Sequence, residues 1–168
     1  MVKARLINLA LLVLVAGLGV FLWSHFFPNE EKRVRKCLEG LQEAVSFEAG
    51  GSLAGTAADS ERLRSLLAPD VEVEVEMPGG GREAMSGRAE IVQAAMGARQ
   101  YLRGLKVELL DVAVQVEPGK DRAACSLTAK ATQPGDRDYV VQEMRLELVK
   151  QDGQWRLRKA AAIRPLKL

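Results

Sequence analysis

Few side chains in this sequence belong to the types that act as nucleophiles, metal ligands or general bases. There is one histidine, His25, and there are two cysteines, Cys37 and Cys125. His25 lies in an apolar segment near the start, so the rest of the chain contains no partner for a His–Asp dyad. One histidine and two cysteines also exclude a Cys/His zinc site. We therefore expect no catalytic residues of these types, no metal and no cofactor.

A row of glutamates raises the question of a cation site. Glu72, Glu74 and Glu76 alternate with valines, as in a strand with valines inward and glutamates in water. Residues two apart on a strand are about 6.6–6.8 Å apart, too far to share one ion coordinated at about 2.3–2.6 Å. We interpret the row as a solvated strand face. Gly79-Gly80-Gly81 lacks the following Lys-Ser/Thr of a phosphate loop and is predicted to be a turn.

The two cysteines fall on different predicted elements. Cys37 lies on the apolar face of a helix, and Cys125 lies in the interior of a strand. Both positions suit a small core residue. An oxidising compartment would permit a disulfide between them, but the sequence does not give the distance between their Cα atoms. The sequence is compatible with two buried free thiols and with a disulfide between them.

Residues 6–27 form an apolar run without Asp, Glu, Lys or Arg. As a helix the run would be about 33 Å long, enough for a hydrocarbon core of about 30 Å. Trp23 suits the membrane interface, and Pro28 would end the helix. The bulky residues around His25 argue against signal-peptide cleavage. We predict a short tail at 1–5, a transmembrane helix at 6–27 and one domain at 28–168.

Basic residues flank the predicted span on both sides. Lys3 and Arg5 favour an N-terminal tail in the cytoplasm, whereas four cations between Lys32 and Lys36 favour the opposite orientation. A long folded domain can translocate regardless of such charges. We therefore predict a single-pass membrane protein whose domain is extracytoplasmic, in the periplasm, rather than cytoplasmic.

The charge balance bears on nucleic-acid binding. Lys and Arg number 24 and Asp and Glu number 22, so the net charge is +2. Two of the basic residues, Lys3 and Arg5, precede the apolar run, and the main body is neutral. A nucleic-acid binder normally carries a basic footprint, so we expect no nucleic-acid partner.

The spacing of apolar residues predicts three helices after the span. The first covers 30–48, with apolar residues three and four apart from Val34 to Val45. A small-residue loop at 50–58 is followed by a short helix that Asp59 or Ser60 caps and that runs to about Leu67. The third helix covers 88–102. Its buried side is predicted to hold Ile91, Ala94, Ala95 and Met96.

The remaining pattern predicts antiparallel strands. A first strand at 71–76 is followed by a short returning strand at 84–86, and four long strands follow the third helix. Asp152-Gly153 is the strongest hairpin signal. The apolar phase slips by one residue at Leu109-Leu110, which indicates a β-bulge that bends the sheet. The fold class is α+β. The four long strands are expected at 105–116, 122–132, 139–150 and 154–163.

This order of elements resembles the nuclear transport factor 2-like (NTF2-like) superfamily, including SnoaL-like and ketosteroid isomerase-like domains. The best local marks are Ala68-Pro69-Asp70-Val71, Ser86–Ile91 and Asp152–Leu157. The resemblance implies helices packed on a strongly bent antiparallel sheet, a cone, with a homodimer through the sheet face. Single-span proteins with such a domain include type IV secretion assembly factors, which implies an envelope protein partner. The superfamily also holds isomerases, cyclases and dehydratases.

The predicted inward phases of the strands contain no acid. On the third long strand the inward phase is Val140, Gln142, Met144, Leu146 and Leu148. The residues expected to reach the pocket of the cone are Tyr101, Cys125, Gln142, Met144 and Trp155. We therefore predict a non-catalytic, membrane-tethered module for ligand binding or protein assembly. The alternative is a SnoaL-like or ketosteroid isomerase-like enzyme, or a carrier, acting on a small apolar molecule. An enzyme would need Asp70, Asp111 or Tyr101 turned into the cone.

Overall fold

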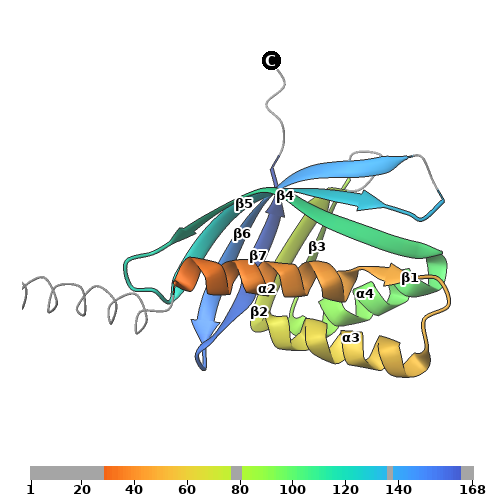
Figure 1. Cartoon of the computed structure of the whole chain (residues 1–168), viewed down its shortest axis with the longest axis horizontal. Coiled ribbons are helices and arrows are strands. Elements are labelled where there is room, and N and C mark those ends of the chain that lie inside the picture. Colours follow the sequence, from red (N-terminus) through yellow and green to blue (C-terminus); the bar gives the residue numbers. More distant parts are fainter. Residues whose placement is uncertain (1–28, 77–80, 136–137, 164–168) are drawn as a thin grey trace, which may run out of the picture.

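The computed structural model describes residues 29–76, 81–135 and 138–163. Three helices lie on one side of a seven-stranded sheet that curls around the first of them (Figure 1). The helices are α2 (Glu30–Val45), α3 (Leu53–Leu66) and α4 (Arg88–Tyr101). This is the predicted α+β class, an NTF2-like or cystatin-like fold. None of the helices in the described ranges is long and apolar enough to span a membrane, and the predicted span at 6–27 lies outside those ranges.

The sheet has the strand order β1-β4-β5-β6-β7-β2-β3. Neighbouring strands are antiparallel except β2 and β7, which are parallel. The parallel pair joins the first half of the chain to its last strand. The strands are β1 (Phe47–Glu48), β2 (Leu67–Glu76), β3 (Arg82–Ser86), β4 (Gly104–Val116), β5 (Arg122–Thr132), β6 (Tyr139–Gln151) and β7 (Gln154–Ala162).

The sheet bends at a β-bulge in β4, as the sequence predicted. The register between β4 and β5 shifts between Leu110 and Ala113, and Asp111 has a φ of 52°. A bulge of this kind increases the local twist and turns the strand. The hairpin between β6 and β7 is also confirmed, because Asp152 and Gly153 both have positive φ (52° and 74°), as a type I′ turn requires.

The hydrophobic core lies between α2 and the concave side of the sheet. On each strand, every second residue faces the core, because successive side chains point to opposite faces of the sheet. Leu66 of α3 also approaches α2 closely, since a Cβ at Gly40 would lie 3.2 Å from its Cδ1. The most deeply buried large side chains are Val34, Leu63, Leu67, Val71, Cys125 and Leu148.

Three predicted boundaries were wrong. The helix expected at 30–48 ends at Val45, because Phe47 and Glu48 form β1 and pair with β4. The loop expected at 50–58 is helical from Leu53, because the Ser52 side chain accepts a hydrogen bond from the Gly55 N–H (3.1 Å) and caps the helix there. Strand β2 begins at Leu67 instead of Val71. Pro69 is tolerated in it because the pairing with β7 is interrupted between Leu67 and Glu72, so no ladder bond needs its missing N–H.

Two predicted burial positions were also wrong. On α4 the residue that joins the core beside Ile91 is Val92, and Ala94 is exposed. On β6 the first expected inward residue, Val140, is 57% exposed, because it lies at the end of the strand beyond the cover of the helices. Leu146 and Leu148, further along β6, are buried as predicted.

The buried stretch of β6 gives the first test. Leu148 is fully buried, whereas Val141 on the same strand is 51% exposed. Leu148→Ala should lower the free energy of unfolding by about 2–5 kcal/mol, since it removes contacts and leaves a cavity. Val141→Ala should change it by less than about 0.5 kcal/mol. Urea unfolding of the two full-length variants measures both, and similar losses would contradict this placement of the core.

Candidate functional site

An apolar cavity of about 220 Å³ opens between the helices and the concave face of the sheet. Its walls come from all three helices and from β2, β4, β5, β6 and β7. No titratable side chain lies among the lining residues, which all belong to the described part of the chain. They are Leu38, Leu41, Gln42, Val45, Leu63, Leu67, Val73, Ile91, Ala95, Val107, Leu109, Leu127, Ala129, Met144, Leu146, Leu157 and Ala160.

Gln42 is the one lining residue with a polar side chain. Its Oε1 accepts a hydrogen bond from the Leu109 backbone N–H at 3.2 Å, just before the bulge in β4. This bond helps to hold the wall made by β4 against α2. The surface that a ligand would meet is therefore formed by aliphatic side chains and the thioether of Met144.

The five residues predicted for the pocket occupy different places. Met144 lines the cavity, and Gln142 is half-buried one inward position nearer the start of β6. Cys125 and Trp155 are buried in the core but do not line the cavity. Tyr101 is 87% exposed at the last position of α4 and points away from the cone, so its expected inward position was wrong. The helical period places Ala95, not Tyr101, over the cavity.

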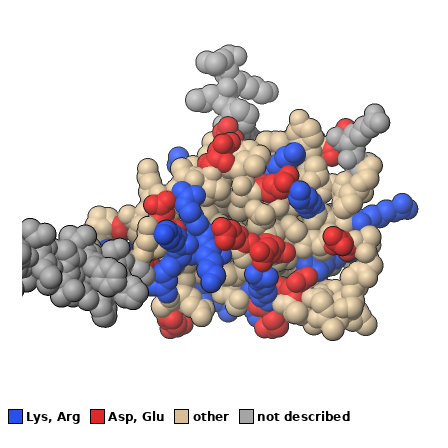
Figure 2. Space-filling model, viewed as in Figure 1, with Lys and Arg blue, Asp and Glu red and all other residues tan. Residues whose placement is uncertain are grey.

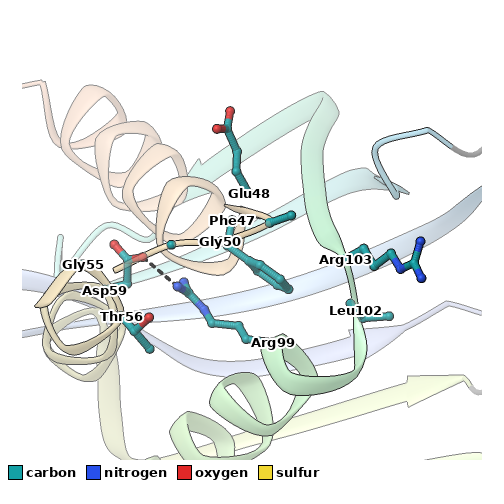
Figure 3. A pocket seen from close by; sticks show the side chains of 11 residues that line it. Phe47, Glu48, Gly50, Gly55, Thr56, Asp59, Arg99, Leu102 and Arg103 are labelled. Atoms are coloured by element: carbon teal, nitrogen blue, oxygen red, sulfur yellow. Dashed lines mark hydrogen bonds and ion pairs between the residues drawn. The ribbon is translucent and has the colours of Figure 1, made fainter. Parts of the chain in front are cut away.

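A second, polar cavity of about 360 Å³ lies where β1 and the end of α4 meet the start of α3 (Figure 3). Arg99 crosses its floor and donates to Asp59 at 2.8 Å and to the Ala44 carbonyl at 3.1 Å. The guanidinium also lies 4.9 Å from the centre of the Phe47 ring. These contacts join the ends of α2 and α4 to α3. Both terminal nitrogens of Arg99 therefore bond within the protein, and the residue holds the three helices together.

Comparison with known proteins identifies the domain. The family model of the SnoaL-like domain matches residues 53–161, from the start of α3 to the end of β7. The chain belongs to the SnoaL-like domain family. No curated protein matches the sequence.

Solved structures show the same fold at low sequence identity. A variant of Rv3472, a protein of unknown function from Mycobacterium tuberculosis, is 19% identical, with a TM-score of 0.60 over 80% of this chain and 75% of that one. An NTF2-like protein from Novosphingobium aromaticivorans is 18% identical, with a TM-score of 0.60 over 89% and 86%. A proposed dehydratase of the NTF2-like family from Streptomyces avermitilis is 20% identical, with a TM-score of 0.58 over 82% and 97%. These similarities support the fold of the SnoaL-like domain.

The two thiols of the SnoaL-like domain are buried and free. Burial, together with the neighbouring Cys125, raises the pKa of Cys37 to about 12, and its Sγ donates to the Trp155 carbonyl at 3.2 Å. Burial also raises the pKa of Cys125 to about 11, although the charge of Arg35 opposes the shift. Since the thiolate is the nucleophile, neither cysteine is activated for chemistry. No group of three or more His, Cys, Asp or Glu side chains that could hold a metal occurs in the described ranges.

The chain also contains a buried carboxylate that its sequence pattern did not predict. Glu30, in the first turn of α2, is only 9% exposed. Its Oε2 accepts the Trp155 indole N–H at 2.8 Å, and its Oε1 accepts from Lys150 at 2.8 Å and from Arg33 at 3.2 Å. The alternation of inward strand residues does not report on Glu30, because this residue lies on a helix. The overlooked signal was Trp155 itself, because a buried indole N–H requires an acceptor.

The partners of Glu30 determine its charge. Burial would raise the pKa of Glu30, but hydrogen bonds from Lys150 and Trp155 and the charges of Lys150 and Arg33 hold it below its ordinary value. The carboxylate is therefore ionised at neutral pH. It joins α2 to the β6–β7 hairpin and does not line the apolar cavity.

The lowered pKa of Glu30 predicts a pH-dependent stability. Its contribution is present above the unfolded-state pKa of about 4.5 and is lost as pH falls through the lower folded-state pKa. Glu30→Gln should therefore cost about 1–3 kcal/mol of unfolding free energy at neutral pH, and the difference from wild type should shrink in acid. Chemical unfolding across this range measures it. Glu39→Gln, at an exposed site of α2, is the control, and a difference that stays constant down to acid unfolding would contradict this assignment.

Proposed function

We propose that this protein binds a small apolar molecule in the cavity of its SnoaL-like domain without transforming it, and that residues 6–27 tether it to a membrane. The observation that carries the first part is the composition of the cavity wall, which contains no titratable side chain. General acid–base catalysis needs such a group within hydrogen-bond reach of the substrate. The cavity can therefore bury a ligand, but none of its lining residues can transfer a proton to or from that ligand.

The walls also define the class of ligand. A polar or charged group buried without a partner costs several kcal/mol, and the Gln42 oxygen is already bonded to the backbone. The ligand should therefore be uncharged and largely hydrocarbon. A cavity of about 220 Å³ is larger than a dry apolar cavity of about 150 Å³ that binds benzene. A compact ring system or a short branched chain fits this size.

The proposed tether rests on the sequence. The run at 6–27 has the length and composition of a membrane span and ends three residues before α2 begins at Glu30. Its bulky C-terminal residues argue against removal by a signal peptidase. We place the SnoaL-like domain on the extracytoplasmic side.

The alternative is an enzyme of the dehydratase or isomerase type. Two of the similar structures are proposed dehydratases, one of them a scytalone dehydratase from Novosphingobium aromaticivorans, which associates this fold with such reactions. The acids named in the sequence analysis do not support this alternative. Asp70 pairs with Arg158 at 3.2 Å and is exposed, and Asp111 is exposed in the bulge of β4. Neither reaches the cavity.

Benzene is a suitable probe of the cavity. Added to the full chain labelled with ¹³C-methyl methionine, it should shift the NMR signal of Met144, whose side chain lines the wall. Ala129→Phe should abolish the shift by filling the cavity, while Ala124→Phe, at an exposed position of the same strand, should leave it intact. Met144→Leu assigns the signal. An unchanged Met144 signal in wild type, or an equal response in the Ala129→Phe variant, would overturn the proposed ligand binding.

A further inference from the structure

At one end of the domain, the first turns of α2 lie beside two turns that connect neighbouring strands. Arg33 donates to the Gly153 carbonyl at 2.6 Å, which ties α2 to the β6–β7 turn. The Lys150 N–H donates to the Asp121 carbonyl at 2.7 Å, which ties that hairpin to the β4–β5 turn. Figure 1 shows both turns at the end where α2 begins. We call the residues 30–36, 117–122 and 150–156 the basic end.

The basic end carries a concentrated positive charge. It holds eight Lys and Arg residues against five Asp and Glu residues, an excess of three, whereas the whole chain has a net charge of +2. Figure 2 shows Lys and Arg side chains gathered over the first half of α2. The cations are Lys32, Arg33, Arg35, Lys36, Lys120, Arg122, Lys150 and Arg156, and the acids are Glu30, Glu31, Glu117, Asp121 and Asp152.

Three of the five acids of this end are occupied, whereas Glu117 and Asp121 are exposed. Glu30 is buried, Glu31 pairs with Arg35 at 2.9 Å and Asp152 pairs with Arg156 at 3.5 Å. Lys32, Lys36 and Arg122 are exposed, and none of them pairs with another residue in the described part of the chain. Three cations of this end therefore face solvent without an ion pair among the described residues, against two exposed acids.

The predicted membrane span joins the domain at this same end, where α2 begins. Three Cα–Cα steps separate Phe27, the last residue of the apolar run, from Glu30, so the two Cα atoms are at most about 11 Å apart. Glu30 is fixed to Trp155 and Lys150, so α2 cannot swing away from the hairpin. A span that ends at Phe27 would hold all three parts of the basic end close to the membrane surface.

From this charge and this attachment point we propose that the basic end docks on the anionic phospholipid surface of the leaflet in which the chain is anchored, an inference that rests on the tether proposed above. Clusters of Lys and Arg beside a span attract acidic lipid headgroups, and the attraction falls off within about a Debye length. Docking fixes the orientation of the domain and leaves the end formed by β1 and the last turn of α4 facing away from the bilayer.

The test measures the distance of each end from lipid. The full chain is reconstituted in vesicles of phosphatidylcholine, alone or mixed with phosphatidylglycerol, that contain a headgroup spin label. A fluorophore is attached to Gln154→Cys at the basic end or to Gln100→Cys on α4 at the opposite end, both exposed positions. Burial protects Cys37 and Cys125 from labelling. Quenching at position 154 should increase at least twofold with phosphatidylglycerol, and the increase should vanish at about 1 M salt.

Matched charge variants separate docking from general attraction. Lys32→Gln, Lys36→Gln and Arg122→Gln together should remove at least half of the extra quenching at position 154. Arg62→Gln, Arg64→Gln and Arg103→Gln remove the same charge elsewhere on the domain and should leave it unchanged. Equal quenching in the two lipids, an equal effect of the two triple variants, or an equal increase at position 100 would overturn the proposal.

The tether itself has a separate readout. Full-length protein should float with vesicles of phosphatidylcholine alone after a high-salt wash, a condition that removes electrostatic docking. Flotation without lipid-dependent quenching means that the tether holds and the docking proposal fails. Loss of flotation overturns the tether, and the docking proposal fails with it.

Discussion

The fold depends on the burial of one face of α2 inside a curled sheet. Val34, Leu38 and Ala44 are 0%, 2% and 1% exposed, and the strands around them supply the matching apolar positions. A flat sheet could not enclose a helix in this way. Burial of α2 therefore also requires the bulge at Asp111, which bends the sheet. Beside the second half of α2, the helices do not fill the concave side of the sheet completely. The apolar cavity is the space that remains.

The two ends of α2 differ in what they bury. At its first turn, a buried carboxylate is satisfied by an indole, an ammonium and a guanidinium. At its last turns, Leu41 and Val45 line a cavity in which Gln42 is already bonded to the backbone. The first arrangement fixes the helix on the sheet, since a half-satisfied charge would be costly. The second leaves room for an uncharged molecule. Polar contacts therefore attach α2 near both of its ends, and the apolar cavity lies beside its second half.

Local pattern was enough to predict most of the architecture, because alternation and helical spacing report burial directly. The bulge followed from a one-residue slip at Leu109-Leu110, and the β6–β7 turn from Asp152-Gly153. The start of α3 at Leu53 was missed because glycine and serine resemble a loop until the Ser52 cap is seen. The inward strand phases predicted a pocket, but they could not report the Glu30 cluster, because Glu30 meets Trp155 only when the chain folds back over more than a hundred residues.

The parallel pair of β2 and β7 also affects the order of folding. β2 at 67–76 pairs with β3 along one edge, but its other edge pairs with β7 at 154–162, the last strand of the sheet, so a loop of about eighty residues must close before the two halves join. Such non-local pairing slows folding. During synthesis β2 and β3 stay separate from the rest of the sheet until β7 has left the ribosome. Chaperones would meet this protein late in synthesis, and a truncation before β7 would separate the two halves of the sheet.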